Sequence, residues 1–321
     1  MRAVVIRDFG VEPELAEVPA PEPGADEVLV RLHAAGMNPF DWKVIDGALK
    51  GVVEHPFPIV MGSDGAGVVE AVGSDVERFR PGDRVYGQFM KVARGLGSYA
   101  ELTVAPAEGK LALVPERLAF TVAAALPTAS VTAYQAIAEA RLGDGDVILV
   151  NGASGGVGQS AVQFAADTGA HVIATAPPDL ADHLRGLGAR EIVDFTQGPT
   201  ADQVLADHAD GIDAILDLVS KPGEAEALVA LLRPGGVAIS TNGALDVEAM
   251  AARELRGVNF FSDATPEVLA TLAELAATGR LQVSIDDEVP LEDAPAAVAR
   301  ARGGHARGKT VILIDVPAGE R

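Results

Sequence analysis

Four glycines follow a short apolar run in the middle of the chain, and their spacing suits dinucleotide binding. Residues 147–150 are all apolar and predict a buried parallel strand, and residues 159–168 predict a helix. Glycines let the backbone approach a pyrophosphate, and the first turn of a helix offers unpaired N–H groups with partial positive charge. The loop residues that we predict to bind the cofactor phosphates are Ser154, Gly155, Gly156, Val157 and Gly158.

The spacing Gly152-x-x-Gly155-x-x-Gly158 differs from the strict G-x-G-x-x-G pattern. A glycine-rich turn between a strand and a helix, with no ligand, is the alternative. The strand and the helix lie on either side of the glycines, where phosphate binding requires them, and this placement favours the dinucleotide interpretation.

Strand-like and helical stretches alternate around this loop, from residue 147 to residue 241. Such a βαβ series predicts a parallel, doubly wound sheet. Residues 121–140 predict a helical region that Pro127 interrupts. Before residue 118 the chain instead has short β-like runs separated by proline and glycine turns, which favour a small barrel. The predicted fold class is therefore α/β, with a barrel domain and a doubly wound domain.

The end of the chain changes character again after residue 261. Residues 266–278 predict an amphipathic helix, and residues 288–291 and 309–314 are β-like. We expect these two runs to return to the first domain.

Composition limits the functional classes. The length of 321 residues favours two domains, and 48% hydrophobic residues favour a globular core. The net charge of −21 opposes binding to nucleic acid or to an anionic membrane surface. The chain has no cysteine, no apolar run of membrane-spanning length and no recognisable signal peptide, so we expect a cytoplasmic protein.

Several short motifs extend over nearly the whole chain, and their order and spacing are specific. With the glycine loop, they lie at residues 38–43, 61–67, 80–85, 97–101 and 304–309. In these motifs the chain resembles the medium-chain dehydrogenase/reductase superfamily, and within it the zinc-independent quinone oxidoreductases similar to zeta-crystallin. The resemblance implies a GroES-like β-barrel domain of residues 1–118 and 263–321. It also implies a Rossmann domain of residues 119–262 and a homodimer formed by pairing Rossmann edge strands.

The resemblance also bears on metal binding. Zinc-dependent relatives place a cysteine where Asn38 stands and a histidine where Ser63 stands, so only Asp64 keeps a possible ligand. For Asp64, a turn-forming role is the favoured alternative. The six histidines show no close pairing along the sequence, and we therefore expect no metal. Without a Lewis acid the hydride acceptor must already be electron-poor, as quinones and α,β-unsaturated carbonyls are.

The choice of cofactor depends on the residues after the second Rossmann strand. That strand ends at Thr175, a predicted cofactor contact, and no carboxylate follows before Asp179, which disfavours NAD. NADP-preferring relatives have a lysine in this loop and a tyrosine where Phe195 stands. Here Arg185 is the nearest cation in sequence, and we predict that it helps to bind NADPH.

Three residues near the N-terminal motif are candidate catalytic residues. Asn38 is predicted to bond a substrate oxygen or a ribose, and a turn residue before proline is the alternative. Asp41 is predicted to orient Lys43 or the ribose, or else to cap a helix. Lys43 is predicted to stabilise a developing oxyanion, and a solvated surface lysine is the alternative.

The resemblance adds five cofactor contacts, which are Thr132, Phe260, Phe261, Arg307 and Lys309. The alternatives are a hydroxyl bonded within its helix for Thr132, and a solvated turn for Arg307 and Lys309. If Phe260 and Phe261 lie on a strand they face opposite sides, so we expect at least one in the core.

Together these observations predict a zinc-independent, NADPH-dependent oxidoreductase that transfers a hydride to a quinone. An enone or enoyl reductase shares every motif named above. A structural or regulatory protein that binds NADPH but turns over little is the third interpretation.

Overall fold

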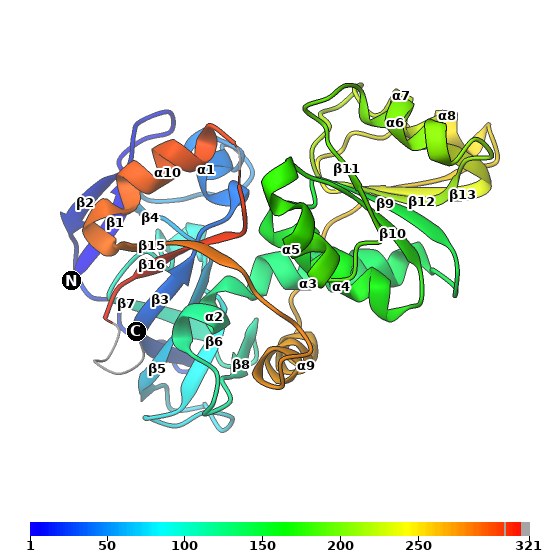
Figure 1. The fold of residues 1–321 in the computed structure, drawn as a ribbon. Coiled ribbons are helices and arrows are strands. Elements are labelled where there is room, and N and C mark those ends of the chain that lie inside the picture. The colour runs from blue at the N-terminus through cyan, green and yellow to red at the C-terminus, as the bar shows by residue number, and fades with distance from the viewer. Residues whose placement is uncertain (305, 316–321) are drawn as a thin grey trace. The chain divides into compact units, whose positions relative to one another are not determined.

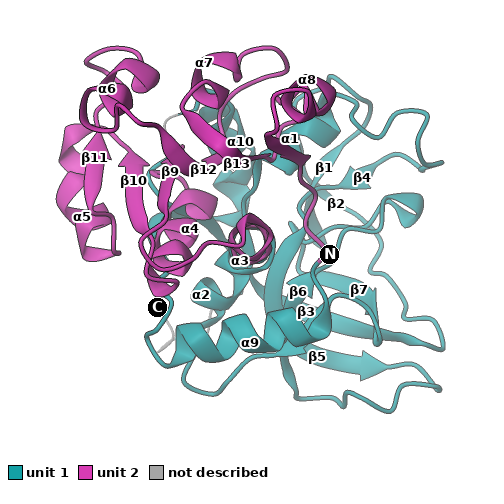
Figure 2. Cartoon of the chain, turned by 90° about the vertical axis from the view of Figure 1, so that its right-hand side faces the viewer, with its two compact units in different colours: residues 1–131, 264–321 teal, residues 132–263 magenta. Residues whose placement is uncertain are grey.

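The structure, a computed structural model, describes residues 1–304 and 306–315 (Figure 1). It divides into two compact units (Figure 2), in which unit 1 joins Met1–Val131 to Ala264–Arg321 and unit 2 is Thr132–Asp263. Unit 1 therefore extends beyond residue 118, the predicted end of the first domain. The reason is that helix α2 (Phe120–Ala125) packs on strands of unit 1.

Unit 1 contains two sheets. The smaller sheet has the order β2 (Glu14–Glu17), β1 (Arg2–Ile6), β4 (Ile59–Val60). The larger sheet has the order β15 (Ile285–Pro290), β16 (Lys309–Leu313), β3 (Glu27–Gly36), β5 (Asp64–Val72), β6 (Arg84–Gln88), β8 (Leu111–Leu113), and β7 (Leu102–Pro106) also pairs with β3. The antiparallel pairing of β16 with β3 confirms that the end of the chain returns to the first domain.

Short helices complete unit 1. They are α1 (Pro39–Ile45), α2, α9 (Pro266–Ala277) and α10 (Ala294–Arg302), with 3₁₀ turns at Val92–Arg94 and Leu291–Asp293. Helix α3 (Pro127–Ala140) begins in unit 1 and continues into unit 2. The break between α2 and α3 falls at Pro127, as predicted, because proline lacks the N–H that would continue a helix.

Unit 2 is a six-stranded parallel sheet with helices in the connections. The strand order is β11 (Glu191–Val193), β10 (His171–Thr175), β9 (Val147–Asn151), β12 (Ile212–Asp217), β13 (Leu232–Ser240), β14 (Arg256–Asn259). The helices are α4 (Gly156–Asp167), α5 (Ala181–Gly186), α6 (Thr200–Asp207), α7 (Glu226–Val229) and α8 (Val247–Ala251), with a 3₁₀ turn at Pro178–Leu180. This order and parallel pairing confirm the doubly wound prediction.

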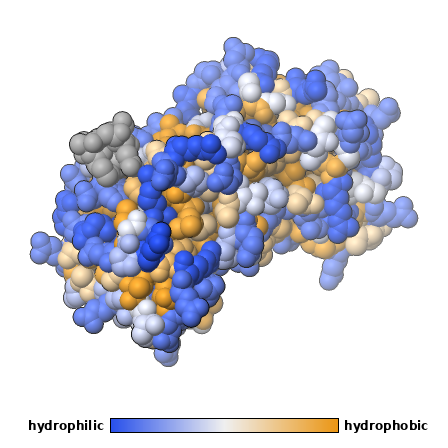
Figure 3. All heavy atoms as spheres, turned by 90° about the horizontal axis from the view of Figure 1, so that it is seen from below, coloured by the Kyte–Doolittle hydropathy of each residue, from blue (hydrophilic) through white to orange (hydrophobic). Residues whose placement is uncertain are grey.

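Each unit has its own apolar core. Residues 148–150 of β9 are fully buried, as a strand in the middle of a parallel sheet requires. Figure 3 shows one face of the molecule, where hydrophilic residues cover most of the surface and apolar residues are exposed between them. Among the described residues, no helix combines the length and the apolar character needed to cross a membrane.

Candidate active site

The glycine loop joins β9 to α4 in unit 2. Gly152 has a φ of +93°, a conformation that favours glycine. A Cβ atom at Gly158 would lie 2.3 Å from the carbonyl oxygen of Gly152, so this contact between helix and loop requires glycine. At Gly155 the nearest heavy atom to an added Cβ is 3.9 Å away, which leaves open space beside the N-terminus of α4. Open space next to unpaired helix N–H groups suits a phosphate.

The loop lies at the point where the strand order of the sheet reverses. β9 pairs with β10 on one side and with β12 on the other, so the crossovers run outward in both directions from β9. A Cβ atom at Gly152 would lie 2.8 Å from Cγ2 of Val219, which shows that the segments after β9 and β12 are neighbours. In open α/β sheets, ligands bind at the carboxyl ends of the strands at such a switch point.

Polar side chains at this edge of the sheet fix the shape of the loop. The N–H of Gly152 donates to Oγ1 of Thr175 at 2.8 Å. The Thr175 hydroxyl donates to Oδ1 of Asn151 at 3.3 Å, and Nδ2 of Asn151 donates to Oδ1 of Asp217 at 2.9 Å. The hydroxyl of Thr175, a predicted cofactor contact, therefore positions the glycine loop from the neighbouring strand.

Asp217 at the end of β12 is a site residue that the sequence analysis did not identify. Its Oδ1 accepts hydrogen bonds from the N–H groups of Val219 and Ser220, both at 3.1 Å. Its buried Oδ2 has no hydrogen-bond partner among the described residues. The signal that could have identified it is an acidic residue at the carboxyl end of a buried strand, the position that lines a dinucleotide crevice.

Gln159 in the first turns of α4 links the loop to α5. Its Nε2 donates to the carbonyl oxygen of Ser154 at 2.8 Å, and its Oε1 lies 2.9 Å from Nε2 of His183. The side chain is 2% exposed, so these contacts hold Ser154 in place from inside the protein.

The segment after β10 differs from a typical NAD site. Thr175 is followed by two prolines and a 3₁₀ turn, Pro178–Leu180, with the first carboxylate at Asp179. Arg185, the cation that we predict to bind a 2′-phosphate, lies on α5 and is ion-paired with Asp182 at 2.9 Å. Since both side chains of that pair are more than half exposed, the attraction is weak and Arg185 can exchange partners at little cost.

The remaining predicted contacts in unit 2 lie near the end of the sheet at β14. Oγ1 of Thr132 and Oγ of Ser262 are 2.9 Å apart, so the Thr132 hydroxyl reaches the segment after β14. Phe260 is partly buried and Phe261 is 87% exposed. The expectation that one of the two belongs to the core is wrong, because β14 ends at Asn259 and the alternation of strand faces does not apply beyond it.

A buried polar cluster in unit 1 brings together Asn38 and Asp41 with residues from distant parts of the chain. Nδ2 of Asn38 donates to Asp64 at 2.9 Å and to the carbonyl oxygen of Gly36 at 3.3 Å. Nζ of Lys309 donates to Oδ1 of Asn38 and to the carbonyl oxygen of Met37. Both hydrogens of the Asn38 amide are thus engaged within the protein. We name Asn38, Asp41, Asp64 and Lys309 the carboxylate–lysine cluster.

Asp41 and Asp64 each stabilise the start of a helix in this cluster. Asp41 accepts from the N–H of Asn38 at 2.7 Å and from the Tyr99 hydroxyl at 2.6 Å, which supports the helix-cap alternative for α1. Asp64 accepts from the N–H of Thr128 at 2.8 Å and from its hydroxyl at 2.6 Å, in the first turn of α3. The sequence favoured a turn-forming role for Asp64. Instead, its buried carboxylate caps α3, a helix that is distant in sequence.

The cluster holds two carboxylates and one ammonium group in a fully buried place. Burial raises the pKa of Asp41 to about 7, although the hydrogen bonds from Tyr99 and Asn38 oppose this increase. Burial also raises the pKa of Asp64 and lowers the pKa of Lys309, and the opposite charges of the two groups reduce both effects. The cluster therefore gains or loses a proton more easily than isolated side chains would near neutral pH.

Two further predicted residues of unit 1 are exposed. Lys43 is exposed on α1 and Arg307 is exposed before β16. Lys309, in contrast, is only 5% exposed, so its alternative as a solvated residue is wrong. His305, part of the C-terminal motif, lies outside the described residues.

The residues at the zinc positions do not fit a catalytic zinc ion. Asn38 offers an amide oxygen that already accepts from Lys309, and Ser63 is a buried serine. Both oxygens of Asp64 accept hydrogen bonds, and the chain has no cysteine. Three ligands with an open fourth position cannot be assembled from this set.

Comparisons with known proteins agree with this geometry. The alcohol dehydrogenase GroES-like domain family matches residues 24–116, and the zinc-binding dehydrogenase family matches residues 187–312. A chloroplastic quinone oxidoreductase of Triphysaria versicolor is 33% identical, and the alignment covers 92% of each chain. The chain belongs to the medium-chain dehydrogenase/reductase superfamily.

Other members of this superfamily are similar over the same length. An NADPH-dependent alkenal/one oxidoreductase of Arabidopsis thaliana, also chloroplastic, is 31% identical, over 97% of this chain and 79% of that protein. The solved structure of the quinone oxidoreductase from Coxiella burnetii is 30% identical and has a TM-score of 0.89, over 98% of this chain and 99% of that one. The superfamily binds a nicotinamide dinucleotide, which fits the glycine loop of unit 2.

Proposed function

We propose that this oxidoreductase transfers a hydride from NADPH to a quinone without a catalytic metal. The observation that carries the proposal is the open space at Gly155, beside the N-terminus of α4 at the switch point of the sheet. When bound, the nicotinamide supplies the hydride. Helix N–H groups at Gly156, Val157 and Gly158 would bind the pyrophosphate, and Thr175 and Gln159 hold that loop in shape.

NADPH is preferred to NADH in this proposal for two reasons. No carboxylate stands at the end of β10 to bind the ribose hydroxyls, and the partner of Arg185 is an exposed carboxylate that a phosphate can replace. The alkenal/one oxidoreductase relative is NADPH-dependent by name, which supports the same choice.

The residues at the zinc positions favour an electron-poor acceptor. With Asn38 and Ser63 where metal ligands would be needed, nothing in this set polarises the carbonyl of a simple aldehyde or ketone strongly. Quinones accept a hydride without such help, and the relatives named quinone oxidoreductases support this substrate class. Lys43 remains our candidate for contact with the substrate, whereas Asn38 and Asp41, whose side chains are buried and hydrogen-bonded inside unit 1, would act through the residues that they position.

A second candidate, reduction of an α,β-unsaturated carbonyl, is favoured by the similarity to the alkenal/one oxidoreductase. NADPH oxidation should be followed at the nicotinamide absorbance with para-benzoquinone, phenanthrenequinone and a 2-alkenone. Turnover of about one per second or more with a quinone supports the first proposal. Activity confined to the alkenone supports the second proposal. No turnover with any of the three acceptors, despite NADPH binding, contradicts both proposals.

We further propose a homodimer and a cytoplasmic location. Strands β11 and β14 form the two edges of the parallel sheet, and an exposed edge can pair with that of a second copy. The absence of cysteine is compatible with a reducing compartment. Light scattering after size-exclusion chromatography tests the dimer, and a monomer at micromolar concentration would contradict it.

A further inference from the structure

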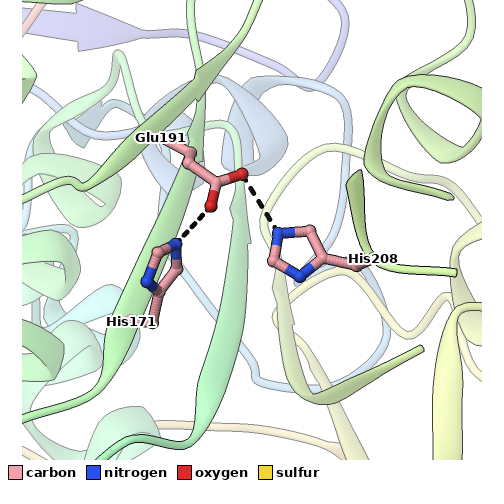
Figure 4. Close-up of side chains that lie close together, drawn as sticks. All are labelled: His171, Glu191 and His208. Atoms are coloured by element: carbon pink, nitrogen blue, oxygen red, sulfur yellow. Dashed lines mark hydrogen bonds and ion pairs between the residues drawn. The ribbon is translucent and has the colours of Figure 1, made fainter. Parts of the chain in front are cut away.

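We propose that His171, Glu191 and His208 form a binding site for a divalent cation of the zinc type, separate from the dinucleotide site. One ligand atom from each of the three side chains can be chosen so that all lie within 4.8 Å of one another. Figure 4 shows the carboxylate of Glu191 between the two imidazole rings. Imidazole nitrogen and carboxylate oxygen are ligands that Zn²⁺ prefers, and His₂Glu is an established set of three with an open fourth position.

The sheet register places two of these side chains on the same face. Residues 171 and 173 share a face of β10, because side chains alternate along a strand. Glu191 is the parallel partner of Ile173, so it points to the same face as His171. Nε2 of His171 is hydrogen-bonded to Oε1 of Glu191. These two ligands are therefore held in place by the backbone of the sheet itself.

The third ligand comes from the connection between α6 and β12. Nε2 of His208 lies 3.0 Å from Oε2 of Glu191. The backbone of His208 is fixed on both sides, since its N–H donates to Val204 at 2.9 Å and its carbonyl accepts from Gly211 at 2.9 Å. A site whose ligands are already positioned loses less conformational entropy on binding.

The charge and exposure of the three side chains suit a cation that enters from solvent. Burial acts to raise the pKa of Glu191, but hydrogen bonds from His208 and His171 outweigh it and hold that pKa below its usual value. The site thus offers one negative charge, and the chain as a whole carries −21. The side chains are partly exposed, at 33% for His171, 34% for Glu191 and 15% for His208, so an ion and a water ligand can reach them.

A tetrahedral zinc ion at about 2.0–2.1 Å from each ligand requires ligand atoms about 3.3 Å apart. The three ligand atoms already lie within 4.8 Å of one another, so a bound ion would draw these side chains closer together. A bound ion would join the edge strand β11 to β10 and to the end of α6, and so stabilise this edge of the sheet. His171 begins β10, whereas Thr175 at its other end contacts the glycine loop, about 13 Å away at strand spacing.

Titration of the purified, tag-free protein with Zn²⁺ and with Co²⁺ tests the site. We expect one ion per chain, a Co²⁺ absorption spectrum of four-coordinate character and a higher Tm with Zn²⁺. In His208→Ala and Glu191→Gln the affinity should fall at least about tenfold and the rise in Tm should disappear. The matched control His55→Ala removes a half-buried histidine of unit 1 and should bind as the wild type does.

Two results would overturn the proposal. One is weak binding of several ions with the same affinity in the wild type, His208→Ala and His55→Ala, which would indicate the acidic surface alone. The other is no binding of either ion at micromolar protein. If His208→Ala does not fold, His171→Asn is the second variant, and circular dichroism establishes its fold before titration. NADPH affinity is measured in parallel and should be unchanged by Zn²⁺, because the two sites lie at opposite ends of β10.

Discussion

The substitution Lys309→Met tests the carboxylate–lysine cluster. The methionine keeps the length and apolar stem of lysine and removes the ammonium group. Asp41 and Asp64 then share a fully buried place without a compensating cation, and Asn38 Oδ1 loses a donor. Removing the cation that compensates these buried carboxylates should cost about 3–5 kcal/mol of the free energy of unfolding, as removal of one member of a buried charge pair does.

The pH dependence of this cost separates charge from packing. Without Lys309, the carboxyl groups of the folded protein hold their protons to higher pH, whereas the unfolded chain has lost them above about pH 5. Each extra proton bound in the folded state makes the cost grow by about 1.4 kcal/mol per pH unit. Between pH 6 and pH 8 the cost of Lys309→Met should therefore increase by up to about 3 kcal/mol.

Urea unfolding at pH 6 and pH 8 measures this cost. The single tryptophan, Trp42, lies on α1 beside the cluster and reports its unfolding by fluorescence. The control Lys50→Met removes an exposed lysine of the same unit and should cost less than about 0.5 kcal/mol at both pH values. In Asp41→Asn/Lys309→Met part of the loss at pH 8 should be recovered. A cost for Lys309→Met that is equal at the two pH values, or smaller at pH 8, would refute the electrostatic reasoning.

Three further substitutions have distinct expected outcomes. Gly155→Asp should abolish NADPH binding in a fluorescence titration, because its carboxylate would occupy and charge the space proposed for the pyrophosphate. Its Tm should change little, since the nearest heavy atom to an added Cβ is 3.9 Å away. Wild-type affinity would rule out the loop assignment. Gly158→Ala should lower both NADPH affinity and Tm, since its Cβ would lie 2.3 Å from the Gly152 oxygen, and an unchanged Tm would show that the loop is not packed as described. For Asp41, a folded pKa of about 7 against the ordinary value of 3.8 means that the folded protein holds the proton to higher pH, so stability falls as pH rises from about 4 to 7. Asp41→Asn should flatten that decrease in urea unfolding, and an equally steep decrease would contradict the assigned pKa.

The fold was predictable from the sequence where strands are buried on both faces. Strand β9 (Val147–Asn151) forms where the continuous apolar run at residues 147–150 predicts a buried strand, because such a run before a glycine turn is distinctive. Strand β2 was missed because its residues are mostly exposed and show no alternation of apolar side chains. Helix α4 begins at Gly156, three residues before the predicted helix at residues 159–168, because the glycines of the loop form its first turn.

The candidate site was predictable only where local spacing encodes it. The glycine loop has its strand and its helix next to it in sequence. The carboxylate–lysine cluster joins Asn38 to Lys309 across 271 positions, and the proposed cation site joins two histidines and a glutamate from three separate segments. Local patterns do not encode such pairings, which depend on the sheet register and on the return of the C-terminal strands to unit 1.

The most direct test of the proposed function is NADPH oxidation with phenanthrenequinone, with and without a chelator, by the wild type and by Gly155→Asp. We predict turnover of about one per second or more by the wild type, unaffected by the chelator, with NADH less effective than NADPH. Gly155→Asp should be inactive. Activity that the chelator removes, or equal activity in Gly155→Asp, would contradict metal-independent hydride transfer from a dinucleotide bound at the glycine loop.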